Sequence, residues 1–177
     1  MSKRDLKKYI QSLDKDQIAE QFLELYSKFP EVKTYYDFIF NPNEEKLLQD
    51  ARVKISAEYF PTKTKKAKLR RSTAQKIIKH FLMLGVEPHI IAEVMLYNIT
   101  IAQKYSAKKE MYYSSFYKSI LNSFEQCLTF CISNGIMPHF KTQILAVVEE
   151  VQKQKWPNKA EFKNSIEIIE EEDRGGF

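Results

Sequence analysis

The chain has 177 residues, of which 44% are hydrophobic and 29% are charged, with a formal net charge of +5. This length fits one domain or two small ones, and the composition excludes wholesale disorder. No apolar run is long enough for a membrane span or a secretory signal, and two cysteines are too few for a disulfide framework. We therefore expect a cytoplasmic protein that does not contact membranes.

The N-terminal residues predict three short helices. Ser2 with Asp5 and Asp14 with Gln17 have the spacing of capping boxes, in which two side chains bond the first free backbone amides of a helix. Pro30 is interpreted as the end of the second helix and the first residue of the third.

A fourth helix and a basic loop are expected next. Asn41-Pro42 is interpreted as the cap and first turn of the helix, and Phe60-Pro61 as its end, since the residue before a proline avoids helical backbone. The stretch from Thr62 to Arg71 has no apolar periodicity and predicts an exposed loop. Ser72 or Thr73 is expected to cap the helix that follows.

The second half of the chain predicts four helices and a tail. Gly85 ends the first of them, and Pro88 starts a second that runs to about Tyr105 and is apolar on nearly all sides, which is typical of a bundle centre. Helices from 114 to 134 and from 138 to about 155 follow. A short helix near Glu161 should precede an acidic, flexible tail over 165–177.

Two segments of the chain repeat each other at an offset of 50 residues. Residues 85–90 read GVEPHI and residues 135–140 read GIMPHF, each between two apolar helical stripes. A duplicated αα-hairpin would explain the match, and so would the common use of glycine and proline at helix junctions. In total we predict an all-α, compact bundle of about eight helices. Its single domain, 1–160, comprises N-terminal helices (1–59), a basic loop (60–71) and two hairpins (72–156).

The sequence contains no recognised catalytic or metal-binding motif. His89 and His139 stand at helix starts, where an imidazole caps backbone donors or faces water. Cys127 and Cys131 share a helix face and fit a core stripe better than a metal site. We expect no catalytic residue, no metal and no cofactor.

The basic loop has the clearest functional chemistry. No acidic residue stands between Glu58 and Glu87, and such a cationic stretch favours phosphate through counterion release. Tyr59 and Phe60 beside it are candidates for base stacking. The predicted nucleic-acid-binding residues are Lys63, Lys65, Lys66, Lys68, Arg70, Arg71, Lys76 and Lys79.

Other functions stay open. A solvated loop would have the same composition, and the acidic residues 167–173 could fold over it as an intramolecular clamp. A helix-turn-helix over Ile77–Tyr105 is disfavoured, because its second helix is too apolar for a DNA groove. The pairs Tyr35-Tyr36 and Tyr112-Tyr113 are candidate anchors for a protein partner, so a protein-interaction module or helical scaffold is the alternative to RNA or DNA binding.

Several segments together resemble a known family. They are KTYYDF at 33–38, Asn41-Pro42, EYFP at 58–61, KHF at 79–81 and the pattern from Leu6 to Glu24. The chain resembles a bacterial family of small helical proteins that is catalogued as a domain of unknown function, over about residues 1–160. The resemblance implies one helical unit and carries no activity, ligand or site residue.

Overall fold

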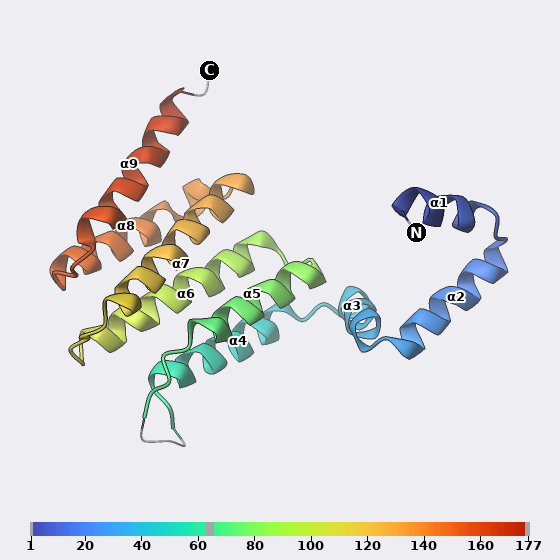
Figure 1. Cartoon of the computed structure of the whole chain (residues 1–177), viewed down its shortest axis with the longest axis horizontal. Coiled ribbons are helices and arrows are strands. Elements are labelled where there is room, and N and C mark those ends of the chain that lie inside the picture. The colour runs from blue at the N-terminus through green and yellow to red at the C-terminus, as the bar shows by residue number, and fades with distance from the viewer. Residues whose placement is uncertain (1, 63–65, 176–177) are drawn as a thin grey trace. The chain divides into compact units, whose positions relative to one another are not determined.

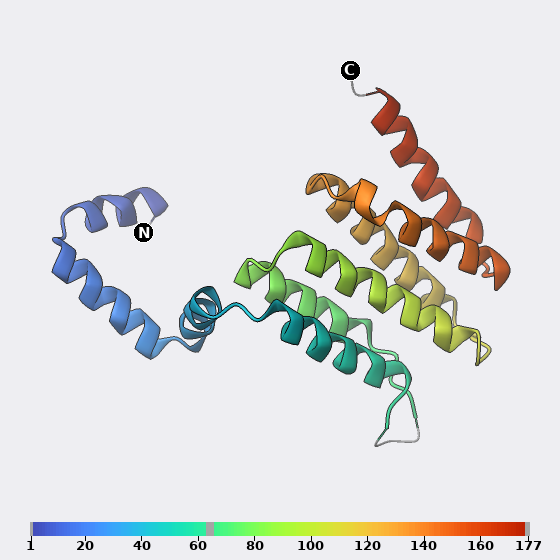
Figure 2. The ribbon, with the colours of Figure 1, turned by 180° about the vertical axis from the view of Figure 1, so that it is seen from behind.

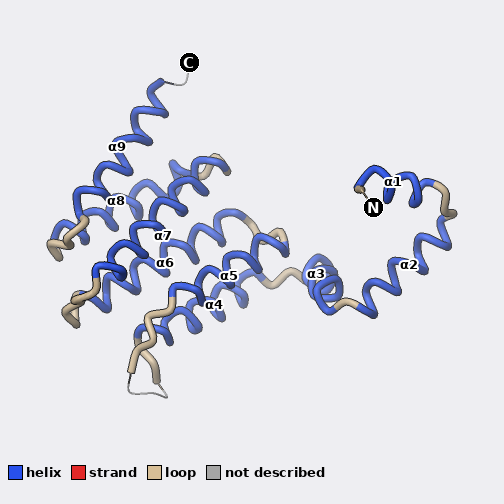
Figure 3. Tube along the Cα trace, viewed as in Figure 1, coloured by secondary structure: helices blue, strands red, loops and turns tan. Residues whose placement is uncertain are grey.

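A computed structural model describes the backbone of residues 2–62 and 66–175, and the side chains of these ranges as far as residue 167. Within these ranges the regular structure is helical and no strand occurs (Figures 1 and 3). The all-α prediction is confirmed. The helices are α1 (Lys3–Gln11), α2 (Lys15–Lys28), α3 (Pro30–Phe40), α4 (Glu44–Tyr59), α5 (Arg71–Leu84), α6 (Pro88–Ser106), α7 (Ser114–Ser133), α8 (Met137–Lys153) and α9 (Lys159–Gly175).

The chain forms two compact units, residues 1–43 (unit 1) and residues 44–177 (unit 2). This division differs from the expected grouping of residues 1–59. Helix α4 belongs to unit 2 because Leu48, Ala51 and Ile55 are buried on it and it packs against α5 and α6. A loop of high positive charge separates α4 from α5 in sequence, but the two helices share one core.

Local sequence signals mark where the helices of unit 1 begin. The capping boxes predicted at Ser2 and Asp14 are both present, and Pro30 is the first residue of α3. The interpretation of Asn41-Pro42 as the start of the next helix is wrong. Asn41 instead ends α3, where its backbone N–H donates to the carbonyl of Asp37 at 3.1 Å, and α4 begins at Glu44.

Helix α6 is the centre of unit 2, as its apolar circumference predicts. It contacts α4, α5, α7 and α8, and Figure 2 shows it running alongside α4, α5 and α7. Ala92, Val94, Ile99 and Ala102 on it have no solvent exposure. A helix buried this way cannot enter a DNA groove, so the structure excludes the helix-turn-helix interpretation.

The repeated segments form matching helix junctions. Gly85 (φ 74°) and Gly135 (φ 67°) both have the left-handed backbone that lets a helix end in a tight turn. Each junction is closed by the same two backbone hydrogen bonds, displaced by 50 residues. They run from Val86 to Phe81 and from Gly85 to Leu82, and from Ile136 to Cys131 and from Gly135 to Ile132. The two junctions therefore match in backbone hydrogen bonds as well as in sequence, which favours a duplicated hairpin.

The C-terminal helix is longer than expected. The sequence predicts a short helix near Glu161, whereas α9 runs from Lys159 to Gly175. It packs against α7 and α8, and its Phe162 ring is fully buried 5.1 Å from the ring of Phe124. Side chains 168–177 lie outside the described residues, and so do those of the predicted clamp of residues 167–173 over the basic loop, apart from Glu167, which pairs with Lys163 on the same helix at 3.3 Å.

Candidate nucleic-acid interface

The C-terminal part of the loop between α4 and α5 is hydrogen-bonded to the end of α4. The backbone N–H groups of Lys68 and Leu69 donate to the carbonyl of Glu58 at 2.9 and 3.0 Å. These two bonds hold residues 68 and 69 against the end of α4. Lys63 and Lys65, predicted to bind nucleic acid, lie outside the described residues.

Arg70 is occupied by a carboxylate of the same unit. Its Nε and Nη2 donate to Oε2 and Oε1 of Glu58 at 3.0 and 2.8 Å. The Arg70 guanidinium, with a further hydrogen bond from the Thr73 hydroxyl, lowers the pKa of Glu58 to about 2. Because Glu58 is only 7% exposed, the pair fixes the start of α5 more than it presents a charge to solvent.

The same contacts correct the predicted cap of α5. Arg70 is the N-cap residue and makes no side-chain capping bond. Thr73 does not cap the helix, because its hydroxyl is bound to Oε1 of Glu58 at 2.9 Å. Ser72, the other predicted cap, lies in the first turn of the helix.

Arg71 bridges two helices. Its Nε donates to the hydroxyl of Ser123 at 2.8 Å and its Nη2 to the amide oxygen of Gln126 at 3.0 Å, both on α7. Burial lowers the pKa of the Arg71 guanidinium. Both partners are neutral, so the charge of Arg71 stays uncancelled, but its guanidinium is directed to α7.

The remaining predicted lysines that the structure describes lie at the surface. Lys66 and Lys68 in the loop, and Lys76 and Lys79 one turn apart on α5, are all exposed. Lys68, Lys76 and Lys79 form no ion pair with a carboxylate in the part of the chain that the structure describes.

A pocket adjoins the basic loop. It has a volume of about 300 Å³ and brings the loop together with the turn after α6. The ammonium groups of Lys108 and Lys109 each lie 5.5 Å from a ring centre, that of Phe60 and that of Tyr105 respectively. The lining residues are Tyr59, Phe60, Pro61, Ala67, Tyr105, Lys108 and Lys109.

The pocket changes the predicted roles of the aromatic residues. Tyr59 is 2% exposed and burial raises its pKa to about 12, so its ring is part of the core. Phe60 is half-buried and its ring meets Tyr105 edge-on at 5.7 Å. Sequence reasoning missed Lys108 and Lys109; the signal was the lysine pair shortly after the helix that is apolar on nearly all sides.

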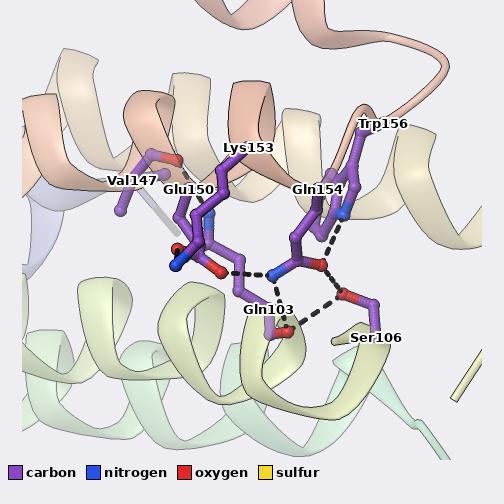
Figure 4. Close-up of polar contacts among 7 residues, drawn as sticks. All are labelled: Gln103, Ser106, Val147, Glu150, Lys153, Gln154 and Trp156. Carbon is purple, nitrogen blue, oxygen red and sulfur yellow. Dashed lines mark hydrogen bonds and ion pairs between the residues drawn. The ribbon is translucent and has the colours of Figure 1, made fainter. Parts of the chain in front are cut away.

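A second polar cluster lies inside unit 2 and joins α6 to the end of α8 (Figure 4). The buried side chain of Gln103 donates to the carbonyl of Val147 at 2.8 Å, and its backbone carbonyl accepts from Ser106 and Gln154 at 3.0 and 3.1 Å. The amide oxygen of Gln154 accepts from Ser106 and from the indole of Trp156. The polar groups of the cluster are hydrogen-bonded to one another, which is typical of a cluster with a structural role.

The histidines and cysteines are placed as follows. The imidazoles of His89 and His139 do not cap their helices and instead meet each other, with ring centres 5.0 Å apart. Cys127 and Cys131 have no solvent exposure, and a hydrogen bond between them, together with burial, raises the pKa of Cys127. No group of three or more metal-ligating side chains occurs among the residues described.

Comparison with known proteins identifies the chain at the level of a family. The family of unknown function DUF6155 matches residues 1–170. The chain belongs to this family. The match confirms the resemblance to an uncharacterised helical domain and extends it through most of α9. No curated protein and no solved structure matches this chain. Among the described residues, no helix has the length and apolar character needed to cross a membrane.

Proposed function

We propose that the protein binds nucleic acid weakly through the basic end of unit 2. This end consists of the loop lysines Lys66 and Lys68 and of Lys108 and Lys109 across the pocket. The observation that carries the proposal is the pocket itself, which places two lysine side chains over aromatic rings beside an exposed basic loop.

The chemistry suits a phosphate backbone next to an unstacked base. Lysine ammonium groups bind phosphate as point charges and release counterions, and a partly exposed aromatic ring offers a stacking surface to any base. Phe60 at the rim is the ring available for this role. A single strand is favoured over a duplex, because a base must leave the stack to reach the ring.

The arginines contribute indirectly. Arg70 and Arg71 hold the start of α5 on Glu58 and α7, so they position the loop and do not contact the ligand. Lys76 and Lys79 extend the proposed footprint along α5. Substitutions that test binding should spare both arginines, since their loss would also disturb packing.

The first experiment removes the four lysines of the basic end. Changing Lys66, Lys68, Lys108 and Lys109 to Gln should reduce the affinity for a fluorescent single-stranded oligonucleotide at low salt at least about tenfold. The slope of log K against log salt should become shallower by about 0.7 for each phosphate that the variant no longer neutralises.

The decisive comparison uses two double variants that remove the same charge. K108Q/K109Q removes two positive charges at the pocket and should weaken binding of the oligonucleotide. K46Q/K141Q removes two positive charges from α4 and α8, away from the pocket. Measured at about 0.1 M salt, where charges more than about 10 Å apart are largely screened, it should leave the affinity within about twofold.

Three outcomes are informative. Equal losses of affinity in the two double variants would show non-specific attraction to net charge and end the proposal. Tighter binding of a duplex than of the single strand would contradict the role of Phe60. Weaker binding in K76Q/K79Q would support the extension of the footprint along α5, and unchanged binding would confine it to the basic end.

A protein-interaction role is the second candidate, and unit 1 supplies its observation. Helices α1, α2 and α3 contain no buried residue, while Leu23 and Phe40 are 67% and 74% exposed. Aromatic residues such as Phe40 are enriched in interfaces, and an exposed leucine such as Leu23 adds apolar contact area. A partner that survives nuclease and high salt, no longer binds Leu23→Glu with Phe40→Glu and still binds K108Q/K109Q would favour this role over nucleic acid.

A further inference from the structure

The duplicated hairpins bring two histidines together at the surface of unit 2. His89 is the second residue of α6 and His139 the third residue of α8. Both imidazoles are exposed, their centres are 5.0 Å apart and their planes are nearly perpendicular at 89°. Neither ring forms a hydrogen bond with any group in the described ranges, so their nitrogens are open to a ligand.

The separation matches that of two imidazoles sharing one metal ion. Zinc–nitrogen bonds are about 2.1 Å long, and a tetrahedral angle then places the two ring centres about 5 Å apart. Because both side chains are exposed, the rings can rotate to direct one nitrogen each at a common point. Imidazole is a preferred ligand of divalent zinc, copper and nickel.

The surroundings of the pair support a cation more than an anion. Helix starts carry partial positive charge, but the carboxylate of Glu44 already accepts the backbone N–H of Glu87 at 2.8 Å beside the start of α6. This carboxylate occupies a donor that an anion would need and lowers the local positive potential. The buried ring of Phe140 packs against both imidazoles, at 5.9 Å from His89 and 5.1 Å from His139, and supports their positions.

We infer that His89 and His139 form a binding site for a divalent first-row transition-metal cation, with water completing its coordination. The site joins the start of α6 to the start of α8, and so links the two hairpins. It is independent of the proposed nucleic-acid interface, because none of the pocket residues takes part in it.

The test uses the full chain and zinc chloride as the probe. Isothermal titration calorimetry near neutral pH should show saturable binding of one zinc ion per chain. His89→Ala and His139→Ala should each weaken binding by about tenfold or more, since even outer-shell changes at metal sites cost about 10- to 100-fold. His80→Ala, a change of the third histidine on α5, is the matched control and should bind as the unaltered protein does.

Two further readouts separate binding at the pair from loss of folding. In NMR spectra the imidazole resonances of His89 and His139 should shift together with zinc, while those of His80 stay in place. His139→Cys keeps a zinc ligand and should retain binding that His139→Ala loses. Absence of saturable binding, or equal weakening in His80→Ala, would overturn the inference and leave the pair as ring packing alone.

Discussion

Helices α1 and α2 of unit 1 each begin with a complete capping box, whereas α5, α6, α7 and α8 of unit 2 begin without any side-chain capping bond. Burial of side chains shows the opposite distribution. The helices of unit 1 contain no buried residue, and every one of those four helices in unit 2 contains several. Local signals therefore define the helices of unit 1, and long-range packing stabilises those of unit 2.

The contrast follows from the cost of forming a helix. A short isolated helix is marginal in water, because several backbone dihedrals are fixed before the hydrogen bonds compensate. A capping box offsets part of that cost with two local bonds, while apolar burial offsets it with side chains from other helices. Substitutions at a core ring, at a buried carboxylate and at a cap should therefore have graded effects.

The largest effect is expected in the core of unit 2. Phe124→Ala removes a fully buried ring that packs on Phe162 and should lower the free energy of unfolding by about 3–5 kcal/mol. Phe22→Ala, at a ring 48% exposed in unit 1, should cost less than about 1 kcal/mol. Urea unfolding followed by circular dichroism measures both. Similar losses in the two variants would contradict the contrast between the units.

Most helix boundaries were predictable because their signals are local. Ser2 and Asp14 start helices, Pro30 separates two of them, and Gly85 and Gly135 end two more, each through bonds or backbone angles within its own segment. Missed boundaries show the limit of such signals. Ser72 and Thr73 look like caps in sequence, but the Thr73 hydroxyl instead donates a hydrogen bond to the Glu58 carboxylate, a contact that forms only when α4 packs against α5.

The candidate sites were less predictable, because their residues come from distant positions. The partners of Arg71 are 52 and 55 residues away, and His89 meets a histidine 50 residues further along the chain. The cationic character of the loop was readable from composition. The sequence did not show which cations bind groups of the protein itself, since that depends on how α4, α5 and α7 pack.

An intermediate effect is expected at Glu58. Glu58→Gln removes the negative charge that Arg70 binds, and should cost about 1–2 kcal/mol near neutral pH. This value is below that of a fully buried pair because the Arg70 side chain is 55% exposed and screened by water.

The pH dependence gives Glu58 a second test. The pKa of its carboxyl falls from 4.5 to about 2 on folding, so the stabilisation is complete above pH 4.5 and is lost as the pH drops toward 2. Urea midpoints of the unaltered protein and of E58Q should therefore converge in acid. A difference that stays constant across this range would assign the effect to shape instead of charge.

A smaller and more local effect than that at Glu58 is expected at a cap of unit 1. The Asp14 carboxylate accepts the backbone N–H of Gln17 at 2.8 Å, and the Gln17 side chain accepts the N–H of Asp14 at 3.0 Å. Asp14→Ala removes the first bond and should cost about 1 kcal/mol, confined to α2. Amide hydrogen exchange measures it as faster exchange in the first turn of that helix.

The matched control is Ser72→Ala, at a position in α5 that has the residue type of a cap without a capping bond in the structure. It should leave exchange in α5 unchanged, because the start of that helix is held by Arg70 and Thr73 on Glu58. If Ser72→Ala instead loosened α5 as much as Asp14→Ala loosens α2, local capping would stabilise both units. The division between a locally capped unit 1 and a core-stabilised unit 2 would then fail, even if the ring substitutions differed as expected.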